Sequence, residues 1–184
     1  MTTADLLFPT SAPRRDIAAD RIRFTVASCS LGLVLVARGE EGVCAVLLGD
    51  DREELARELR RHFPAASLAD GGSELLAIAD EVRAGIDDPR RAIDVPVVLR
   101  GTIFQQRVWQ RLCEIPVGET ATYGEIAVSL GLPSSARAVA RACAANLLAV
   151  VIPCHRVVRS DGSPSGYRWG AARKAALLVR ERAT

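Results

Sequence analysis

The sequence lacks several features that define common classes of protein. No run approaches the roughly 20 consecutive apolar residues that a membrane-spanning helix needs, and the apolar stretch 26–36 is broken by serine and glycine. The first residues do not follow the basic, apolar and small-residue order of a signal peptide, and the chain has no internal repeat. We therefore expect a cytoplasmic protein that does not interact with a membrane.

Cysteine and histidine are too few and too scattered for the usual metal or disulfide frameworks. The cysteines are odd in number, none is spaced as CxxC, and only two histidines accompany them. We therefore expect no metal site, and the default for each cysteine is a small buried hydrophobe. The five cysteines are Cys29, Cys44, Cys113, Cys143 and Cys154.

Lysine is almost absent, and charge is unevenly distributed along the 184 residues. Of the 24 cationic residues, all but Lys174 are arginine. Residues 1–100 carry 13 arginines against 17 acidic residues, a net charge of −4, whereas residues 101–184 carry 10 arginines and one lysine against 5 acidic residues, a net charge of +6. The basic second half is therefore the candidate for binding a polyanion such as nucleic acid.

Residues 1–20 have the composition of a loose leader. They are followed by short runs of β-branched residues and leucine that are bounded by glycine. Their spacing predicts a three-stranded antiparallel sheet. Two amphipathic helices come next, and a segment rich in aspartate, proline and arginine then has the composition of a linker. The first half therefore predicts an α/β domain. The expected strands are 21–28, 31–38 and 42–48, the expected helices 50–63 and 73–85, and the linker 86–96.

The second half changes to a helical pattern, with expected helices at 104–114, 123–130 and 135–145. A glycine-containing break separates the last two, which is the order of a helix-turn-helix. The third helix is nearly all alanine and carries Arg137 and Arg141 on one face. Such small side chains allow close approach either to a nucleic-acid groove or to another helix, and both interpretations stay open.

The most informative segment for function is 150–158, where an apolar run is followed by Pro153, Cys154 and His155. A thiol reacts as its thiolate, and a nearby imidazole or guanidinium lowers its pKa. Cys154 is followed by one of each, His155 and Arg156. Successive side chains of an extended segment point to opposite faces, so we expect Cys154 and His155 to cooperate through a water, with a carboxylate orienting the imidazole. A buried structural thiol is the alternative. The candidate carboxylates are Glu114, Glu119, Glu125, Asp161 and Glu181.

The segment 153–157, Pro-Cys-His-Arg-Val, resembles the active-site motif of the O6-alkylguanine-DNA alkyltransferases, and the resemblance continues from Gly101 to Glu181. It is nearest to the Ada-type branch of that family. The first half, from Arg21 to Phe63, is more weakly similar to the family's ribonuclease H-like domain. Further landmarks occur in the family's order at 104–109, 118–123, 135–139, 144–146 and 166–170.

The resemblance implies an α+β fold of two domains. Residues 21–96 would form the ribonuclease H-like α/β domain with its linker, and residues 97–184 a mostly helical, winged-helix-like domain with a helix-turn-helix. The implied activity is direct-reversal DNA repair: an alkyl group passes once and irreversibly from O6-alkylguanine, and from O4-alkylthymine, to Cys154 after base flipping. The implied partner is double-stranded DNA, bound through the minor groove by a monomer, and no cofactor is implied.

The resemblance also implies a role for each matching residue. Cys154 accepts the alkyl group, His155 acts as a base through a water, and Glu181 holds the imidazole. Asn146 joins the recognition helix to the active-site strand, and Tyr123 helps to turn out the nucleotide and protonates the guanine. The implied DNA contacts are Tyr123, Gly124, Ala136, Arg137 and Ser160, with Arg137 filling the gap left by the flipped base. The implied pocket residues are Cys143, Pro153, Val157, Tyr167, Arg168 and Trp169, with Trp169 limiting bulky substituents.

Three other classes compete with this interpretation. A non-catalytic DNA-damage sensor would lack the acceptor cysteine, whereas Cys154 is present. A transcriptional regulator would need base-reading side chains on the alanine-rich helix, which offers few. A cysteine hydrolase that turns over would need an oxyanion hole and a histidine from a distant segment, and only His62 is available.

Overall fold

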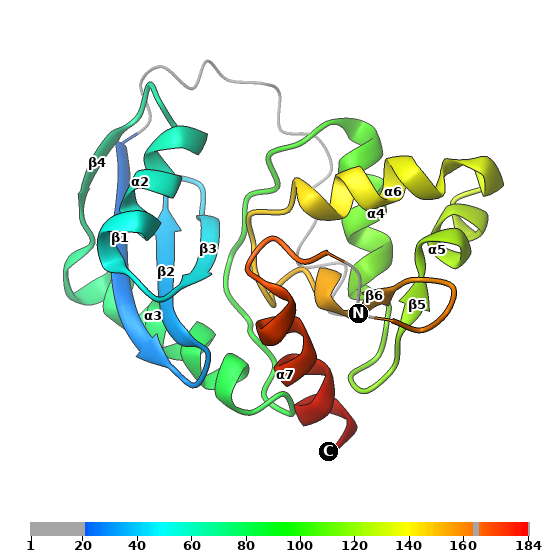
Figure 1. The fold of residues 1–184 in the computed structure, drawn as a ribbon. Helices are drawn as coiled ribbons and strands as arrows, with labels where there is room; N and C mark the ends of the chain where they lie inside the picture. Colours follow the sequence, from blue (N-terminus) through cyan, green and yellow to red (C-terminus); the bar gives the residue numbers. More distant parts are fainter. Residues whose placement is uncertain (1–20, 164–165, 184) are drawn as a thin grey trace. The chain divides into compact units, whose positions relative to one another are not determined.

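The computed structural model describes residues 21–163 and 166–183, and its chain divides into two compact units between Val98 and Leu99 (Figure 1). The predicted leader, 1–20, lies outside the described residues. Together the two units make a mixed α+β protein. Within the described residues, no helix is both long and apolar enough to cross a membrane.

In its described part, residues 21–98, the first unit is built on a sheet of four strands in the order β3-β2-β1-β4. Strands β1 (Arg21–Cys29), β2 (Gly32–Arg38) and β3 (Val43–Gly49) pair antiparallel, as the sequence predicts. The prediction of three strands was wrong, because β4 (Ser67–Asp70) adds a fourth, parallel to β1. Only four residues long and largely exposed, β4 shows no alternation of apolar residues, and its pairing with β1 is what makes it a strand.

Two helices cover this sheet. Helix α2 (Arg52–His62) packs against β2 and β3, and α3 (Gly72–Asp87) against β1 and β2. The Asp51 side chain accepts a hydrogen bond from the Glu54 amide at 2.7 Å, which satisfies one of the free N–H groups at the start of α2. Consecutive residues of β3 are buried, so β3 is covered on both faces.

The predicted linker is in part structured. Helix α3 runs into it as far as Asp87. At its other end, the Val43 amide donates to the Pro96 carbonyl at 2.7 Å, and the Val98 amide donates to the Val43 carbonyl at 2.8 Å. These bonds attach the segment to the edge of the sheet, so it belongs to the first unit.

The second unit carries the helix-turn-helix. Its elements are α4 (Ile103–Cys113), β5 (Ala121–Thr122), α5 (Tyr123–Ser129), the 3₁₀ turn η2 (Pro133–Ser135), α6 (Ala136–Ala144), the 3₁₀ turn η3 (Cys154–Arg156), β6 (Val157–Val158) and α7 (Ala171–Arg182). Strands β5 and β6 pair in parallel. Thr102 and Thr122 each form a capping box, which explains why α4 and α5 start where they do.

Helix α4 holds both helices of the helix-turn-helix in place. The Trp109 indole donates to the Ala142 carbonyl of α6 at 2.9 Å, and Arg111 Nε donates to the Ser129 hydroxyl of α5 at 2.9 Å. The α6 residues Val139 and Ala142 are buried, whereas Arg137 is exposed. Both interpretations of the alanine-rich helix therefore have a structural counterpart: one face packs on α4 and the other presents arginine.

Candidate active site

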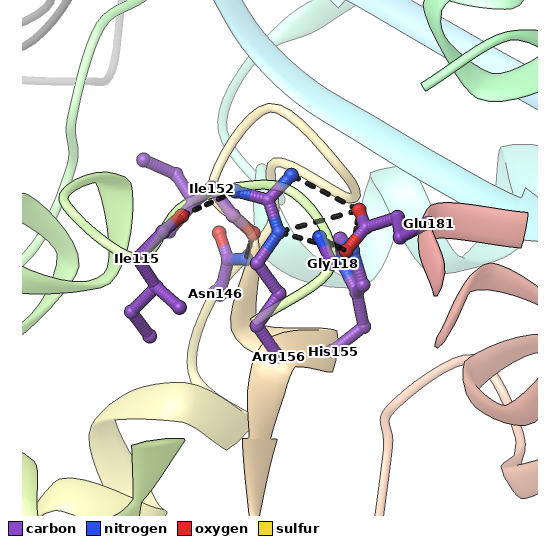
Figure 2. Close-up of polar contacts among 7 residues, drawn as sticks. All are labelled: Ile115, Gly118, Asn146, Ile152, His155, Arg156 and Glu181. Atoms are coloured by element: carbon purple, nitrogen blue, oxygen red, sulfur yellow. Dashed lines mark hydrogen bonds and ion pairs between the residues drawn. The ribbon is translucent and has the colours of Figure 1, made fainter. Parts of the chain in front are cut away.

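The loop between α6 and η3 is organised around the buried side chain of Asn146. Its Oδ1 accepts from the Leu148 amide at 2.8 Å, and its Nδ2 donates to the Ile152 carbonyl at 3.1 Å (Figure 2). Val150 sits in this loop with a φ of +66°, a left-handed conformation that is uncommon for a β-branched residue. Asn146 therefore supplies the hydrogen bonds that a tight and strained loop requires.

Cys154 follows this loop and is buried next to the side-chain amide of Asn146. Cys154 is 5% exposed, and its Sγ accepts from Asn146 Nδ2 at 3.2 Å. Burial raises the pKa of the thiol to about 11, although the Asn146 hydrogen bond and the nearby positive charges of Lys174 and Arg168 act against this shift. The resting cysteine is therefore a thiol, and it needs a base to become a nucleophile.

Cys154 and His155 lie in the 3₁₀ turn η3, so the expected extended segment was wrong here. Two backbone hydrogen bonds at the end of the loop stabilise this turn: the Cys154 amide donates to the Ile152 carbonyl at 2.7 Å, and the Arg156 amide donates to the Pro153 carbonyl at 3.0 Å. Extended backbone starts only at Val157, the first residue of β6.

His155 is fully buried and is oriented by a carboxylate. Its Nε2 lies 2.8 Å from Glu181 Oε1, so Glu181 is the one of the five candidate carboxylates that meets the imidazole (Figure 2). Burial lowers the pKa of His155, against the opposing effect of Glu181. Hydrogen bonds from His155 and Arg156 outweigh the burial of Glu181 and lower its pKa to about 2. An ionised carboxylate accepts only, so the neutral ring carries its proton on Nε2.

The other ring nitrogen of His155 is left as an acceptor. Nδ1 is buried and has no hydrogen-bond partner among the described residues. An unprotonated nitrogen on a neutral imidazole is what a general base requires, and the residue before His155 is the Cys154 thiol. The structure thus brings together Cys154, His155, Glu181 and Asn146, as the resemblance implies.

Aromatic side chains stand beside this cluster. The rings of His155 and Tyr167 meet edge to face at 6.4 Å, and those of Tyr167 and Trp169 at 5.1 Å. Tyr167 Oη and Trp169 Nε1 are buried and have no partner among the described residues. Burial also raises the pKa of Tyr167, so its phenol stays neutral. Arg168 Nε donates to the Ala144 carbonyl at 3.1 Å and so ties this segment to the end of α6.

The remaining predicted residues occupy two kinds of position. Pro153, Val157 and Cys143 are buried, and burial raises the pKa of Cys143. The predicted DNA contacts are half-buried or exposed: Tyr123 and Gly124 start α5, Ala136 and Arg137 start α6, and Ser160 follows β6.

Two cations belong to the cluster, although neither was among the predicted site residues. Arg156 forms an ion pair with Glu181. Lys174 on α7 is fully buried and donates to the Val157 carbonyl, and burial lowers its pKa. The sequence feature that could have singled out Lys174 is that it is the one lysine among 24 cationic residues.

In the described residues, no group of three or more histidine, cysteine, aspartate or glutamate side chains is placed to hold a metal ion. The site is instead a buried thiol beside a neutral imidazole and an ionised carboxylate. It shares a unit with a helix-turn-helix that has an exposed arginine. These features are the ones expected of a DNA-binding protein that uses a cysteine as its nucleophile.

Comparison with known proteins identifies the family. Residues 103–183 match the profile described as 6-O-methylguanine DNA methyltransferase, DNA binding domain. The inducible methylated-DNA–protein-cysteine methyltransferase of Bacillus subtilis is 37% identical over 159 residues, which cover 86% of this chain and 84% of that protein. The chain therefore belongs to the methylated-DNA–protein-cysteine methyltransferase family.

Two further relatives add detail. The bifunctional transcriptional activator/DNA repair enzyme Ada of Escherichia coli is 51% identical over 160 residues; the match covers 87% of this chain but only 45% of the length of Ada. The crystal structure of Mycobacterium tuberculosis OGT in complex with DNA superposes with a TM-score of 0.70 at 33% identity, covering 89% of this chain and 93% of that one.

Proposed function

We propose that this chain repairs DNA by direct reversal, accepting the alkyl group of O6-alkylguanine, and of O4-alkylthymine, on Cys154. The observation that carries the proposal is the buried Cys154 thiol, hydrogen-bonded by Asn146 at 3.2 Å, next to a histidine whose Nδ1 is unpartnered. The names of the relatives support the same chemistry, since the Bacillus subtilis protein is called a methylated-DNA–protein-cysteine methyltransferase.

The residues suggest how the thiol becomes reactive. A water placed between Cys154 and His155 would carry the thiol proton to Nδ1, while Glu181 holds the ring through Nε2. The thiolate then attacks the alkyl carbon, and the S–C bond forms as the bond from carbon to guanine O6 breaks. The guanine leaves as its anion and takes up a proton, for which Tyr123 is the proposed donor.

Each molecule would act once. The product is a chemically inert thioether, and the proposed reaction contains no step that removes the alkyl group from Cys154. The transfer is therefore stoichiometric and irreversible. A cysteine hydrolase would instead release its acyl group and turn over.

DNA is the proposed partner, bound as a duplex through its minor groove by a monomer. Helix α6 has small side chains at its exposed N-terminus, where Ala136 and Arg137 lie, and this suits close approach to a groove. Arg137 would occupy the gap left by the flipped nucleotide. Tyr123, Gly124 and Ser160 would complete the contacts.

The finer fold assignment is part of the proposal. We infer a ribonuclease H-like domain over 21–96 from the β3-β2-β1-β4 sheet with its two helices, and a winged-helix-like domain over 97–184 from the helix-turn-helix next to the β5–β6 pair. Close to Cys154, the side chains Cys143, Pro153, Val157, Tyr167, Arg168 and Trp169 would form the pocket for the alkylated base.

The deciding experiment is the mass of the intact protein after mixing with a duplex that contains one O6-methylguanine. We expect a gain of one methylene mass per molecule that saturates at one equivalent. Cys154→Ser should abolish the gain while changing the affinity for DNA by no more than a few fold. Restored guanine with unchanged protein mass would point to a demethylase that turns over, and no change in either would leave a DNA-damage sensor.

A further inference from the structure

The Glu181 carboxylate is shared between a titratable ring and a permanent cation. Oε1 accepts from His155 Nε2 at 2.8 Å and from Arg156 Nη2 at 3.0 Å, and Oε2 accepts from Arg156 Nε at 3.0 Å (Figure 2). Arg156 thus binds both oxygens with two adjacent N–H groups, the bidentate geometry of a strong ion pair. The side chain of Glu181 is only 2% exposed, so water screens this pair little.

Arg156 is fixed at a second point. Its Nη1 donates to the carbonyl oxygen of Ile115, just after α4, at 2.6 Å, and its side chain is 12% exposed. The guanidinium is therefore held between the end of α4 and the carboxylate on α7. Because an arginine does not lose its proton in a protein, its charge is present at every pH that matters here.

This arrangement changes what Glu181 does to His155. A buried histidine that faces a lone carboxylate tends to take up a proton, since the ion pair so formed is strong where the dielectric constant is low. Here Arg156 balances the charge of Glu181, so the pair has no net charge. The carboxylate can still accept the Nε2 hydrogen bond and set the orientation of the ring, but it attracts a second proton less strongly.

The other groups that face His155 either also disfavour a protonated ring or carry no charge. Lys174 on α7 adds positive charge nearby and also disfavours a charged ring. Tyr167, from the segment after Gly166, presents a ring whose phenol is neutral. Cys154, the preceding residue, rests as a thiol. Burial is the largest of the effects that keep the ring neutral, and Arg156 and Lys174 add to it, while Glu181 opposes them.

We propose that Arg156 is a positioning residue that neutralises the charge of Glu181 and thereby keeps the His155 imidazole uncharged and able to accept a proton at physiological pH. A protonated ring carries hydrogen on both nitrogens and has no acceptor left. The consequence for alkyl transfer rests on the proposed function. The charge arrangement itself does not, and it is tested separately.

The first test is an NMR titration of the histidine ring nitrogens, which suits this chain because it contains only His62 and His155. In Arg156→Gln, the pKa of His155 should rise by about one unit or more, which is about a tenfold change in proton affinity. In Arg156→Lys, which keeps the charge, it should stay near the parent value. His62, in the other unit, should titrate alike in all variants.

Arg182→Gln is the matched control, since it removes an exposed arginine from α7 one residue beyond Glu181. It should leave the titration of His155 unchanged. The proposal is overturned if folded Arg156→Gln shows no rise in the pKa of His155. If that variant does not fold, Arg156→Lys decides the question. A rise in the pKa of His155 in this variant, which keeps the cation, would also contradict the proposal.

The second test is the pH dependence of single-turnover alkyl transfer. Arg156→Gln should be slower than the parent near pH 6, by no more than about tenfold for a one-unit rise in the pKa of His155, and should recover to within about threefold above pH 8, because there the ring is neutral in both proteins. A loss that is equal at every pH would show a merely structural role. If the parent transfers no alkyl group, the proposed function fails, while the NMR titration still decides the role of Arg156.

Discussion

The amide of Asn146 donates a hydrogen bond to the sulfur of Cys154 over 3.2 Å, and the same side chain holds the loop between them. One residue therefore shapes the loop at the end of α6 and touches the proposed acceptor. Oδ1 serves only the loop, whereas Nδ2 serves both the loop and the sulfur, so substitutions that keep or remove Oδ1 separate part of the two contributions.

Asn146→Ala should reduce both stability and alkyl transfer. It leaves the buried amide of Leu148 without its partner, and an unsatisfied group of this kind costs about 1–3 kcal/mol. The carbonyl of Ile152 loses one hydrogen bond but keeps the one from the Cys154 amide. The hydrogen bond that favours the Cys154 thiolate is lost as well. Urea unfolding and the transfer rate would be measured together. Asn146→Asp keeps Oδ1 for Leu148 but places an acid near the sulfur, so it should retain more stability than Asn146→Ala and still transfer slowly.

Glu181→Gln should slow alkyl transfer by about 10²-fold, the scale of a lost general base. A glutamine amide can donate to His155 Nε2, which would move the ring proton to Nδ1 and remove the acceptor. The rate of methyl transfer from duplex DNA is the measurement, with Glu119→Gln as a control in an exposed turn. An unchanged rate would show that another carboxylate orients the imidazole.

Stability should fall in acid because of Glu181. Hydrogen bonds from His155 and Arg156 overcome burial and lower its pKa from the ordinary value of 4.5 to about 2. A carboxyl whose pKa is lowered on folding stabilises the protein above the pKa of the unfolded state, and this contribution is lost as pH falls through the folded value. We therefore expect a loss of stability between about pH 4.5 and pH 2. Urea midpoints from pH 7 to pH 2 would test this, and Glu181→Gln should show a smaller slope.

Arg137→Ala should impair transfer from duplex DNA more than transfer from single-stranded DNA. The exposed guanidinium near the start of α6 is proposed to fill the gap in the stack, which only a duplex contains. Flipping a base costs a few kcal/mol, so the loss on duplex should be about ten- to a hundredfold. Arg141→Ala, one turn further along α6, is the matched control. Equal losses on both substrates would rule out the gap-filling role.

Trp169→Gly should widen the range of alkyl groups that the site accepts. Trp169 is 4% exposed and its ring contacts Tyr167 at 5.1 Å, so it occupies space beside the proposed pocket. The rate with O6-benzylguanine relative to O6-methylguanine, both in duplex DNA, should rise by about tenfold or more, the usual scale for shape selection by an apolar wall. If the parent already reacts equally with both, Trp169 does not limit the pocket.

Local patterns in the sequence predicted the features that depend on neighbouring residues. The apolar repeats of α2 and α3, the threonine cap of α4 and the glycine break between α5 and α6 all arise from interactions within a few positions. The run from Pro153 to Val157 likewise identified the chemistry, because the reactive groups are adjacent in the chain. The resemblance then proposed a role for each matching residue.

Local patterns could not decide the features that depend on distant partners, which the tertiary structure brings together. Strand β4 exists because β1 pairs with it, and the residues themselves did not distinguish Glu181 from four other carboxylates. The clamp of Arg156 on that carboxylate joins residues 25 positions apart. Burial and charge, which make Cys154 a thiol and His155 a neutral ring, likewise depend on the surrounding protein. The sequence determined which groups are present, and the path of the folded chain decided which of them meet.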